Sequence, residues 1–466
     1  MKEPTEKLST ASPDSTAGLI AEDRRSLWHP FTQTAEWLSY DPIVVESADG
    51  FFLVASDGRR YLDGVSSIWC NVHGHGHPAI VAAMKEQLDR VSHSTLLGLS
   101  HVPAITLAKH LTEITPDGLT RVFYSDSGST AVEVALRMAF QYWRQKGQEQ
   151  RTRFVSLADA YHGDTLGAVS LGRSHPFHTG YEPITFEVLK FRPPFLCPPH
   201  NGSGHGDLEE AARASLAELE QLLDSQGEQI AAVVIEPLVQ GAAGIWPQPP
   251  SFVAGLRQLC DRFGVLMIAD EVATGFGRTT SMFAVEQAGV CPDIMCLAKG
   301  LTAGYLPLAA TLASEEIYQA FSAPYEEYKT LFHGHTYGGN PLGCAAAIAN
   351  LKVFSDEAVL ETCRRGAAVF ADLLDRYIGP LAEAGQTGPP RQVGMMAAFD
   401  LTAGPGTPHP PAQRRAHRAV LAAREQGVII RPLADCMVLM PPLTIPADLL
   451  ERLVATTAEA VVEASK

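Results

Sequence analysis

The segment that decides the fold class is Gly264-Val265-Leu266-Met267-Ile268-Ala269-Asp270-Glu271. An unbroken apolar run of this length is typical of a strand that is buried on both faces of a sheet. The run ends in two carboxylates, and in an open parallel sheet ligands bind just beyond the carboxyl ends of the strands. Asp270 is therefore a candidate ligand-binding residue, with a cap at the strand end as the other interpretation.

Further apolar runs lie on the N-terminal side of this segment. They cover residues 122–124, 154–157 and 231–235, and helical stretches such as 130–144 and 252–263 separate them. Strands that alternate with helices in this way form a mainly parallel sheet with helices on both faces. The sequence therefore predicts an α/β fold with a large domain of this kind.

The two ends of the chain have a different pattern. Short strands are expected at residues 43–45 and 51–54, and the C-terminal part mixes helices with strands. This arrangement favours a smaller α+β domain that is built from both chain ends. The expected division is a flexible tail over 1–26, a first part of the small domain over 27–75, the large domain over 76–345 and the rest of the small domain over 346–466.

The composition excludes several classes of protein. The chain has 466 residues, of which 46% are hydrophobic and 19% charged, and its net charge is −16. It has neither a basic patch nor an apolar run of membrane-spanning length, so we expect binding to neither nucleic acid nor membrane. The N-terminus has no apolar signal-peptide core and the eight cysteines are scattered, which favours a cytoplasmic protein with reduced thiols.

Common nucleotide and metal motifs are missing from the sequence. It contains no GxxxxGKS/T phosphate loop, no GxGxxG after a strand and no HExxH. The alternating histidines of His73-Gly74-His75-Gly76-His77 suggest a metal at first sight. Their glycines favour a turn, however, and no carboxylate adjoins them in the sequence, so we expect no metal site.

Four segments could together bind one cofactor. Asp126-Ser127-Gly128-Ser129-Thr130 opens a helix after a strand, which suits a phosphate, although serine and threonine there are also ordinary helix caps. Lys299 ends an apolar run, where a lowered pKa would suit a Schiff-base lysine; a surface lysine is the alternative. Tyr161 follows the strand at 154–157 and could stack on a flat ring, or be a buried loop tyrosine. With Asp270 for a pyridine nitrogen, these residues fit pyridoxal phosphate.

The chain also resembles a known family. Residues 264–279 followed by Lys299 are similar to the signature of the class III aminotransferases, which are fold type I pyridoxal phosphate enzymes. The resemblance extends from about residue 27 to 442 and is strongest to the members that act in biotin synthesis. It rests further on Trp28-His29-Pro30-Phe31-Thr32, Asp63 to Ser67, His73-Gly74-His75, Asp126 to Glu133, Tyr161 to Thr165, Gln240-Gly241-Ala242, His333 to Thr336, Gly339-Asn340-Pro341 and Ile430-Arg431-Pro432.

The resemblance implies roles for individual residues at the cofactor. Lys299 matches the lysine that binds the cofactor and moves the proton. Asp270 matches the partner of the pyridine nitrogen, and Tyr161 matches the aromatic residue on the ring. Gly128 and Ser129 match the phosphate-binding turn.

Other matching residues imply a second subunit and a substrate site. Thr336, with Gly334 and His335 beside it, matches the hydroxyl that reaches the cofactor phosphate of the neighbouring subunit. The resemblance therefore implies a homodimer with shared active sites. Arg431 matches the arginine that receives the substrate carboxylate, a role that suits a bidentate guanidinium.

Three expected substrate-pocket positions depart from the pattern of members that use S-adenosylmethionine. Phe31 replaces a tyrosine, Ile68 precedes Trp69 where those members have a tryptophan pair, and His335 replaces a proline. An aromatic face attracts a sulfonium cation, so these changes concern the amino donor. They leave the cofactor residues intact.

The resemblance implies amino transfer to 8-amino-7-oxononanoate, which gives 7,8-diaminononanoate. S-adenosylmethionine is the expected donor and L-lysine the alternative. Another activity of the family, on ornithine, 4-aminobutyrate or β-alanine, is a further alternative. A non-catalytic scaffold is the remaining one, but a scaffold has no need of a buried lysine near Asp270.

Overall fold

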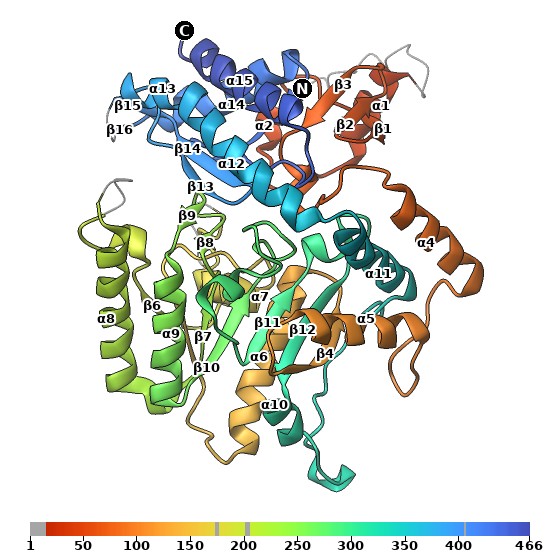
Figure 1. Cartoon of the computed structure of the whole chain (residues 1–466), viewed down its shortest axis with the longest axis vertical. Helices are drawn as coiled ribbons and strands as arrows, with labels where there is room; N and C mark the ends of the chain where they lie inside the picture. Colours follow the sequence, from red (N-terminus) through yellow and green to blue (C-terminus); the bar gives the residue numbers. More distant parts are fainter. Residues whose placement is uncertain (1–14, 173–176, 201–205, 405–406) are drawn as a thin grey trace, which may run out of the picture.

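The computed structural model describes residues 15–172, 177–200, 206–404 and 407–466 (Figure 1). At its centre lies a seven-stranded sheet with the strand order β4-β12-β11-β10-β7-β5-β6. In that order the strands are Leu119–Ser125, Ala309–Ser314, Ile294–Leu297, Leu266–Asp270, Ile230–Ile235, Arg153–Leu157 and Leu189–Phe191. Within this sheet β12 is antiparallel to both neighbours and the other pairs are parallel, which confirms the predicted mainly parallel sheet.

Helices cover both faces of this sheet, because successive strand residues point to opposite sides. In β10, Ile268 packs with α6 and α7 on one face, whereas Met267 packs with α8 and α9 on the other. The four helices are Gly128–Gln145, Leu166–Gly172, Leu208–Gln226 and Pro250–Phe263. Helices α5 (Val102–Ile114) and α11 (Pro341–Asp356) pack against each other near β4. The predicted α/β class is therefore confirmed.

The two ends of the chain meet in a second, smaller unit at the top of Figure 1. Strand β3 from the N-terminal part pairs in parallel with β17 from the C-terminal part, and β1 and β2 extend the same sheet. A second four-stranded sheet has the order β13-β14-β19-β18. This confirms a smaller α+β part built from both ends, while the residue limits of the two domains stay a prediction.

The remaining elements have the following bounds. In the smaller unit the strands are β1 Val45–Asp49, β2 Phe52–Ala55, β3 Arg60–Asp63, β13 Arg391–Val393, β14 Met396–Asp400, β17 Val428–Ile429, β18 Arg431–Leu433 and β19 Cys436–Leu439. The other helices are α1 Thr16–Ser26, α2 Thr34–Trp37, α3 Ser66–Trp69, α4 Pro78–Arg90, α10 Glu315–Ala320, α12 Val359–Tyr377, α13 Gly379–Glu383, α14 Arg415–Glu425 and α15 Ala447–Ala464. Two short hairpins pair β8 (Val239–Gln240) with β9 (Trp246–Pro247) and β15 (Thr402–Gly404) with β16 (Thr407–Pro408). No helix in the described ranges has the length and apolar character to cross a bilayer.

The prediction of a flexible tail was wrong for its second half. Residues Thr16–Ser26 form helix α1, and the Ser15 hydroxyl caps it by accepting a hydrogen bond from the Gly18 N–H at 3.2 Å. Contacts to distant residues attach this helix, because Thr16 Oγ1 lies 2.9 Å from Ser56 Oγ and Arg24 donates to the Tyr40 carbonyl. Such tertiary contacts cannot be seen in a polar sequence. Residues 1–14 of the predicted tail lie outside the described residues.

Candidate active site

A cavity of about 350 Å³ lies at the carboxyl ends of β5, β7 and β10. This is the edge of the sheet at which the sequence predicts a ligand. The residues that line the cavity come from segments far apart in the chain. Among them are six of the predicted site residues, namely Trp69, Gly128, Ser129, Tyr161, Asp270 and Lys299.

The N-terminus of α6 forms one wall of the cavity. Ser127 caps this helix, and its hydroxyl and that of Thr130 form a reciprocal capping box. A Cβ on Gly128 would lie 2.6 Å from Val272 Cγ1, so a side chain there would clash. The same residues can therefore cap the helix and bind an anion. The positive end of the α6 dipole points at the space beside Gly128, which we call the cradle, and a larger residue at position 128 would clash there.

Asp270 ends β10 and is almost completely buried, with 5% of its surface exposed. His162 Nδ1 donates a hydrogen bond to Asp270 Oδ2 at 2.7 Å, and the Val272 N–H donates to Oδ1 at 3.1 Å. The buried His162 Nε2 has no hydrogen-bond partner among the described residues. The carboxylate is therefore held in one orientation at the cavity wall, as a partner for a protonated ring nitrogen must be.

Lys299 follows β11 and also lines the cavity. Its Nζ lies 4.9 Å from the centre of the Trp69 ring. Burial lowers the pKa of the Lys299 amine, and the nearby Asp270 carboxylate opposes this shift. A lowered pKa increases the fraction of neutral amine, which is the nucleophilic form. The surface-lysine interpretation is therefore wrong.

Tyr161 lines the cavity next to these groups and is tied down at both ends. Its backbone N–H donates to Glu236 Oε1 at 3.0 Å, and its hydroxyl donates to Asp164 Oδ2 at 2.7 Å. Its ring stacks on that of His178, with 5.4 Å between centroids and 15° between planes. Burial, followed by the bond to Asp164, raises the pKa of the Tyr161 hydroxyl, which therefore stays protonated.

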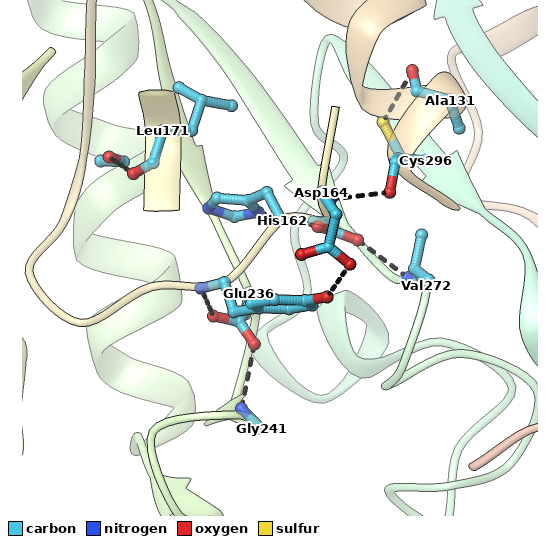
Figure 2. Close-up of polar contacts among 12 residues, drawn as sticks. Ala131, His162, Asp164, Leu171, Glu236, Gly241, Val272 and Cys296 are labelled. Carbon is cyan, nitrogen blue, oxygen red and sulfur yellow. Dashed lines mark hydrogen bonds and ion pairs between the residues drawn. The ribbon is translucent and has the colours of Figure 1, made fainter. Parts of the chain in front are cut away.

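Glu236 is the main residue that the sequence analysis missed. It follows the buried strand β7, and its Oε2 accepts a hydrogen bond from the Gly241 N–H at 2.9 Å. Figure 2 shows this bond between the Glu236 carboxylate and Gly241. Burial raises the pKa of Glu236 to about 7. The signal that identified Asp270, a carboxylate after an apolar strand, is also present here and could have identified Glu236.

Phe31, Ile68 and Arg431 do not line this cavity. The Arg431 guanidinium lies 5.9 Å from the centre of the Phe31 ring, and burial lowers its pKa. Phe31 in turn contacts Phe177, which contacts Tyr161, at centroid distances of 5.8 and 6.3 Å. Phe31 and Ile68 are 55% and 51% exposed. The cluster of Phe31 and Arg431 thus lies on the Tyr161 side of the cavity, with Phe31 exposed and Arg431 half-buried.

The predicted residues Gly334, His335 and Thr336 line a separate cavity of about 1350 Å³. His335 Nδ1 donates to Asp126 Oδ2 at 2.9 Å, and the Thr336 carbonyl accepts from His93 Nε2 at 2.9 Å. Within one chain these residues are therefore not brought together with Lys299.

The three histidines of residues 73–77 bond to three different partners. His75 donates to Asp63 at 3.0 Å and His77 to Glu357 at 3.1 Å, while His73 bonds to an asparagine amide oxygen at 2.7 Å. Carboxylate partners thus exist although none adjoins the motif in sequence. The described residues contain no group of three or more histidine, cysteine and acidic side chains that could hold a metal ion.

The sequence is similar to those of known proteins over almost its whole length. The sequence profile of the family "Aminotransferase class-III" matches residues 35–461. An adenosylmethionine-8-amino-7-oxononanoate aminotransferase from Nitratidesulfovibrio vulgaris is 52% identical over 96% of this chain and 82% of that protein. The enzyme of the same name from Geobacter sulfurreducens is 48% identical over 93% of this chain and 94% of its own length.

Solved structures show the same similarity in three dimensions. The crystal structure of adenosylmethionine-8-amino-7-oxononanoate aminotransferase from Methanocaldococcus jannaschii has a TM-score of 0.89 at 39% identity and covers 96% of this chain and 98% of its own. An amine transaminase from an uncultivated Pseudomonas species, solved with pyridoxal phosphate bound, has a TM-score of 0.86 at 36% identity, over 94% of this chain and 98% of its own.

Proposed function

The chain belongs to the class III aminotransferases and has their fold type I structure, and on this premise we propose that it transfers an amino group to 8-amino-7-oxononanoate, a step of biotin synthesis. The observation that carries the proposal is the identity of 48–52%, over nearly the full length, to enzymes named for this reaction. The cavity around Lys299 supports the proposal, because Lys299, Asp270 and Tyr161 line it and amino transfer with pyridoxal phosphate needs such side chains.

The cavity fits pyridoxal phosphate, the cofactor of this family. The cradle at Gly128, which a Cβ would fill, and the adjacent Ser129 would hold the phosphate at the start of α6. Asp270 would hold the pyridine nitrogen, Tyr161 would lie on the ring and Lys299 would bind the aldehyde. When bound, the cofactor supplies an electron sink that stabilises negative charge on the substrate carbon.

The protein supplies proton transfer and orientation. Lys299 Nζ, whose pKa burial lowers, would take the proton from the substrate carbon and deliver it to the aldehyde carbon of the bound cofactor. Asp270 would keep a proton on the ring nitrogen of the bound cofactor, and the hydrogen bond from His162 holds the Asp270 carboxylate in place for this role. Arg431 would orient a substrate by its carboxylate, which suits its position beside Tyr161.

S-adenosylmethionine is the proposed amino donor, because the relatives are named for it. L-lysine is the second candidate. Phe31, which stands beside Arg431, lacks the hydroxyl of the expected tyrosine, and Ile68 offers no aromatic face. The third departing position, His335, lines the separate cavity and bonds to Asp126, which itself lines the cavity around Lys299.

We further propose a homodimer in which Gly334, His335 and Thr336 of one chain complete the site of the other. Their position in a separate cavity supports this arrangement. So does the surrounding surface, where Leu97 is 89% and Phe332 68% exposed, since large apolar side chains gathered on one face mark an interface. The domain limits at residues 27, 76 and 346 and a cytoplasmic location also remain predictions.

A half-reaction tests the proposed chemistry and the donor together. Each donor is offered alone to the protein loaded with pyridoxal phosphate, and the absorbance of the bound cofactor is followed. We expect conversion to the pyridoxamine form with S-adenosylmethionine. Conversion by L-lysine alone would assign the other donor, and no conversion by either amine would contradict the proposed function.

A further inference from the structure

Three residues of the short segment Ser66–Trp69 have a left-handed backbone although none of them is a glycine. The φ angle is 50° at Ser66, 60° at Ser67 and 66° at Trp69. Such conformations are strained for a residue with a Cβ and persist only where surrounding contacts impose them. Strain of this kind is concentrated at functional sites, so the contacts that hold this segment have a bearing on the cavity at its end.

The segment places the Trp69 side chain next to the Lys299 amine. The indole is 9% exposed, and its centre lies 4.9 Å from Lys299 Nζ. On the other side it lies against the backbone of Gly241, where an added Cβ would be 3.4 Å from the ring. Trp69 is therefore part of the wall that shields the lysine amine from water, and desolvation is the largest cause of the lowered pKa of Lys299.

A buried carboxylate holds the strained segment. Asp63, at the end of β3, has no exposed surface. Its Oδ1 accepts a hydrogen bond from the Val65 N–H at 3.2 Å and its Oδ2 accepts one from the Ser67 N–H at 2.8 Å. His75 Nε2 adds a donor from outside the segment, at 3.0 Å from Oδ2. Because a buried carboxylate is costly unless it is fully bonded, this last donor stabilises the whole arrangement.

The backbone on either side of His75 fixes the position of its side chain next to Asp63. Gly74 and Gly76 have φ angles of 84° and 72°, and a Cβ on Gly74 would lie 2.9 Å from the Gly50 carbonyl oxygen. The His75 N–H donates to that same oxygen at 2.6 Å. The two glycines therefore let the chain turn tightly on either side of a fixed histidine.

We propose that His75 is a positioning residue of the active site, whose bond to Asp63 holds the segment Ser66–Trp69 and thereby keeps Trp69 over Lys299. This explains the alternating histidines and glycines without a metal ion. The proposal rests on the proposed role of Lys299, but the burial of Trp69 can be measured without cofactor or substrate.

The test compares two amides at position 75. Glutamine can place its amide nitrogen where Nε2 lies and donate to Asp63, whereas asparagine is one methylene shorter. The measurement is acrylamide quenching of Trp69 fluorescence in the cofactor-free protein, taken as the difference from the same protein with Trp69→Phe. We expect His75→Asn to raise the Trp69 quenching constant several-fold and His75→Gln to keep it near that of the parent. With cofactor bound, kcat should fall several-fold in His75→Asn and recover in His75→Gln.

A neighbouring histidine provides the matched control. His77 bonds to the half-exposed Glu357, so His77→Asn should leave the quenching of Trp69 unchanged. The proposal would be overturned if His75→Asn and His75→Gln gave the same Trp69 quenching constant. It would also be overturned if His77→Asn raised that constant as much as His75→Asn does. If His75→Asn does not fold, the double variant with Ser67→Gly, which removes strain at φ 60°, should fold and protect Trp69; failure to do so would also overturn it. A parent protein without transaminase activity would refute the proposed function and leave the Trp69 result standing.

Discussion

At the scale of single residues, Lys299 is subject to two opposing effects. Burial removes water from its amine and lowers the pKa, whereas the Asp270 carboxylate stabilises the charged form. Desolvation is the larger of the two. A lysine that is neutral part of the time in a cavity with an oriented carboxylate can both bind a carbonyl and carry a proton.

The substitution Lys299→Ala should abolish transamination while the fold is kept. Loss of a general base alone typically lowers a rate by about 10²–10⁴-fold, and the cofactor also loses its attachment. Turnover with each donor is the measurement, with the circular dichroism spectrum as the check on folding. Lys352→Ala, which removes a surface lysine of α11, should leave turnover unchanged; activity of Lys299→Ala within tenfold of the parent would refute its role.

Glu236 should make the stability of the cofactor-free protein depend on pH. Its pKa is raised from 4.5 to about 7, so the folded state holds a proton that the unfolded state has lost between these values. Stability therefore falls as pH rises through this window, by about 3 kcal/mol in total from this group. Glu236→Gln removes the titration. The difference in thermal midpoint between Glu236→Gln and the parent should be larger, in favour of the variant, at pH 8 than at pH 5. The same difference at both pH values would contradict the raised pKa of Glu236.

The sequence identified part of the site because its signals are local. Asp270 and Lys299 each end an apolar run that is visible in the sequence, and the structure brings both to one cavity. Glu236 carries the same signal, a carboxylate directly after a buried apolar strand, and could have been identified in the same way. The partners of His75 and His162 could not be predicted, because Asp63 and Asp270 reach them only through the fold.

At the scale of elements, the start of α6 depends on one glycine. Gly128→Ala would place a Cβ 2.6 Å from Val272 Cγ1 and push the helix terminus out of place. Overpacking of this kind costs about 1–3 kcal/mol, so the Kd for pyridoxal phosphate should rise roughly 5- to 150-fold if this cost falls on the bound state. Gly343→Ala in α11 is the control, because its Cβ would meet Leu308 at an ordinary 3.5 Å. Equal affinity in the Gly128→Ala variant would show that the cradle does not hold the phosphate.

The element predictions succeeded where periodicity is strong. Strand β7 is an unbroken apolar run, β10 is one up to Asp270, and β5 is mostly apolar; the helices between them cover both faces as expected. Helix α1 was missed because its sequence is polar and its stability depends on a cap and on distant contacts. The strained turn at Ser66–Trp69 has no apolar pattern that would predict it. It depends on the bond from the Ser67 N–H to Asp63 and on the long-range bond from the Ser66 hydroxyl to the Met440 carbonyl.

At the scale of the whole molecule, the proposed dimer predicts recovery of activity by mixing. Lys299→Ala and Thr336→Ala chains should each be impaired alone. In a mixed dimer, one site would combine an intact Lys299 with an intact Thr336. Random mixing should restore about a quarter of the parent activity, because half of the dimers would carry one intact site of two. No recovery in a mixture that sedimentation shows to be dimeric would contradict shared sites.

The central claim is the reaction itself, and product analysis tests it most directly. The purified protein with pyridoxal phosphate is given 8-amino-7-oxononanoate and one donor, and the products are identified by mass spectrometry. We predict 7,8-diaminononanoate with S-adenosylmethionine, or with L-lysine if the pocket at Phe31 and Ile68 selects that donor, and none from Lys299→Ala. Failure to aminate this keto acid with either donor, together with turnover of ornithine, 4-aminobutyrate or β-alanine, would contradict the account.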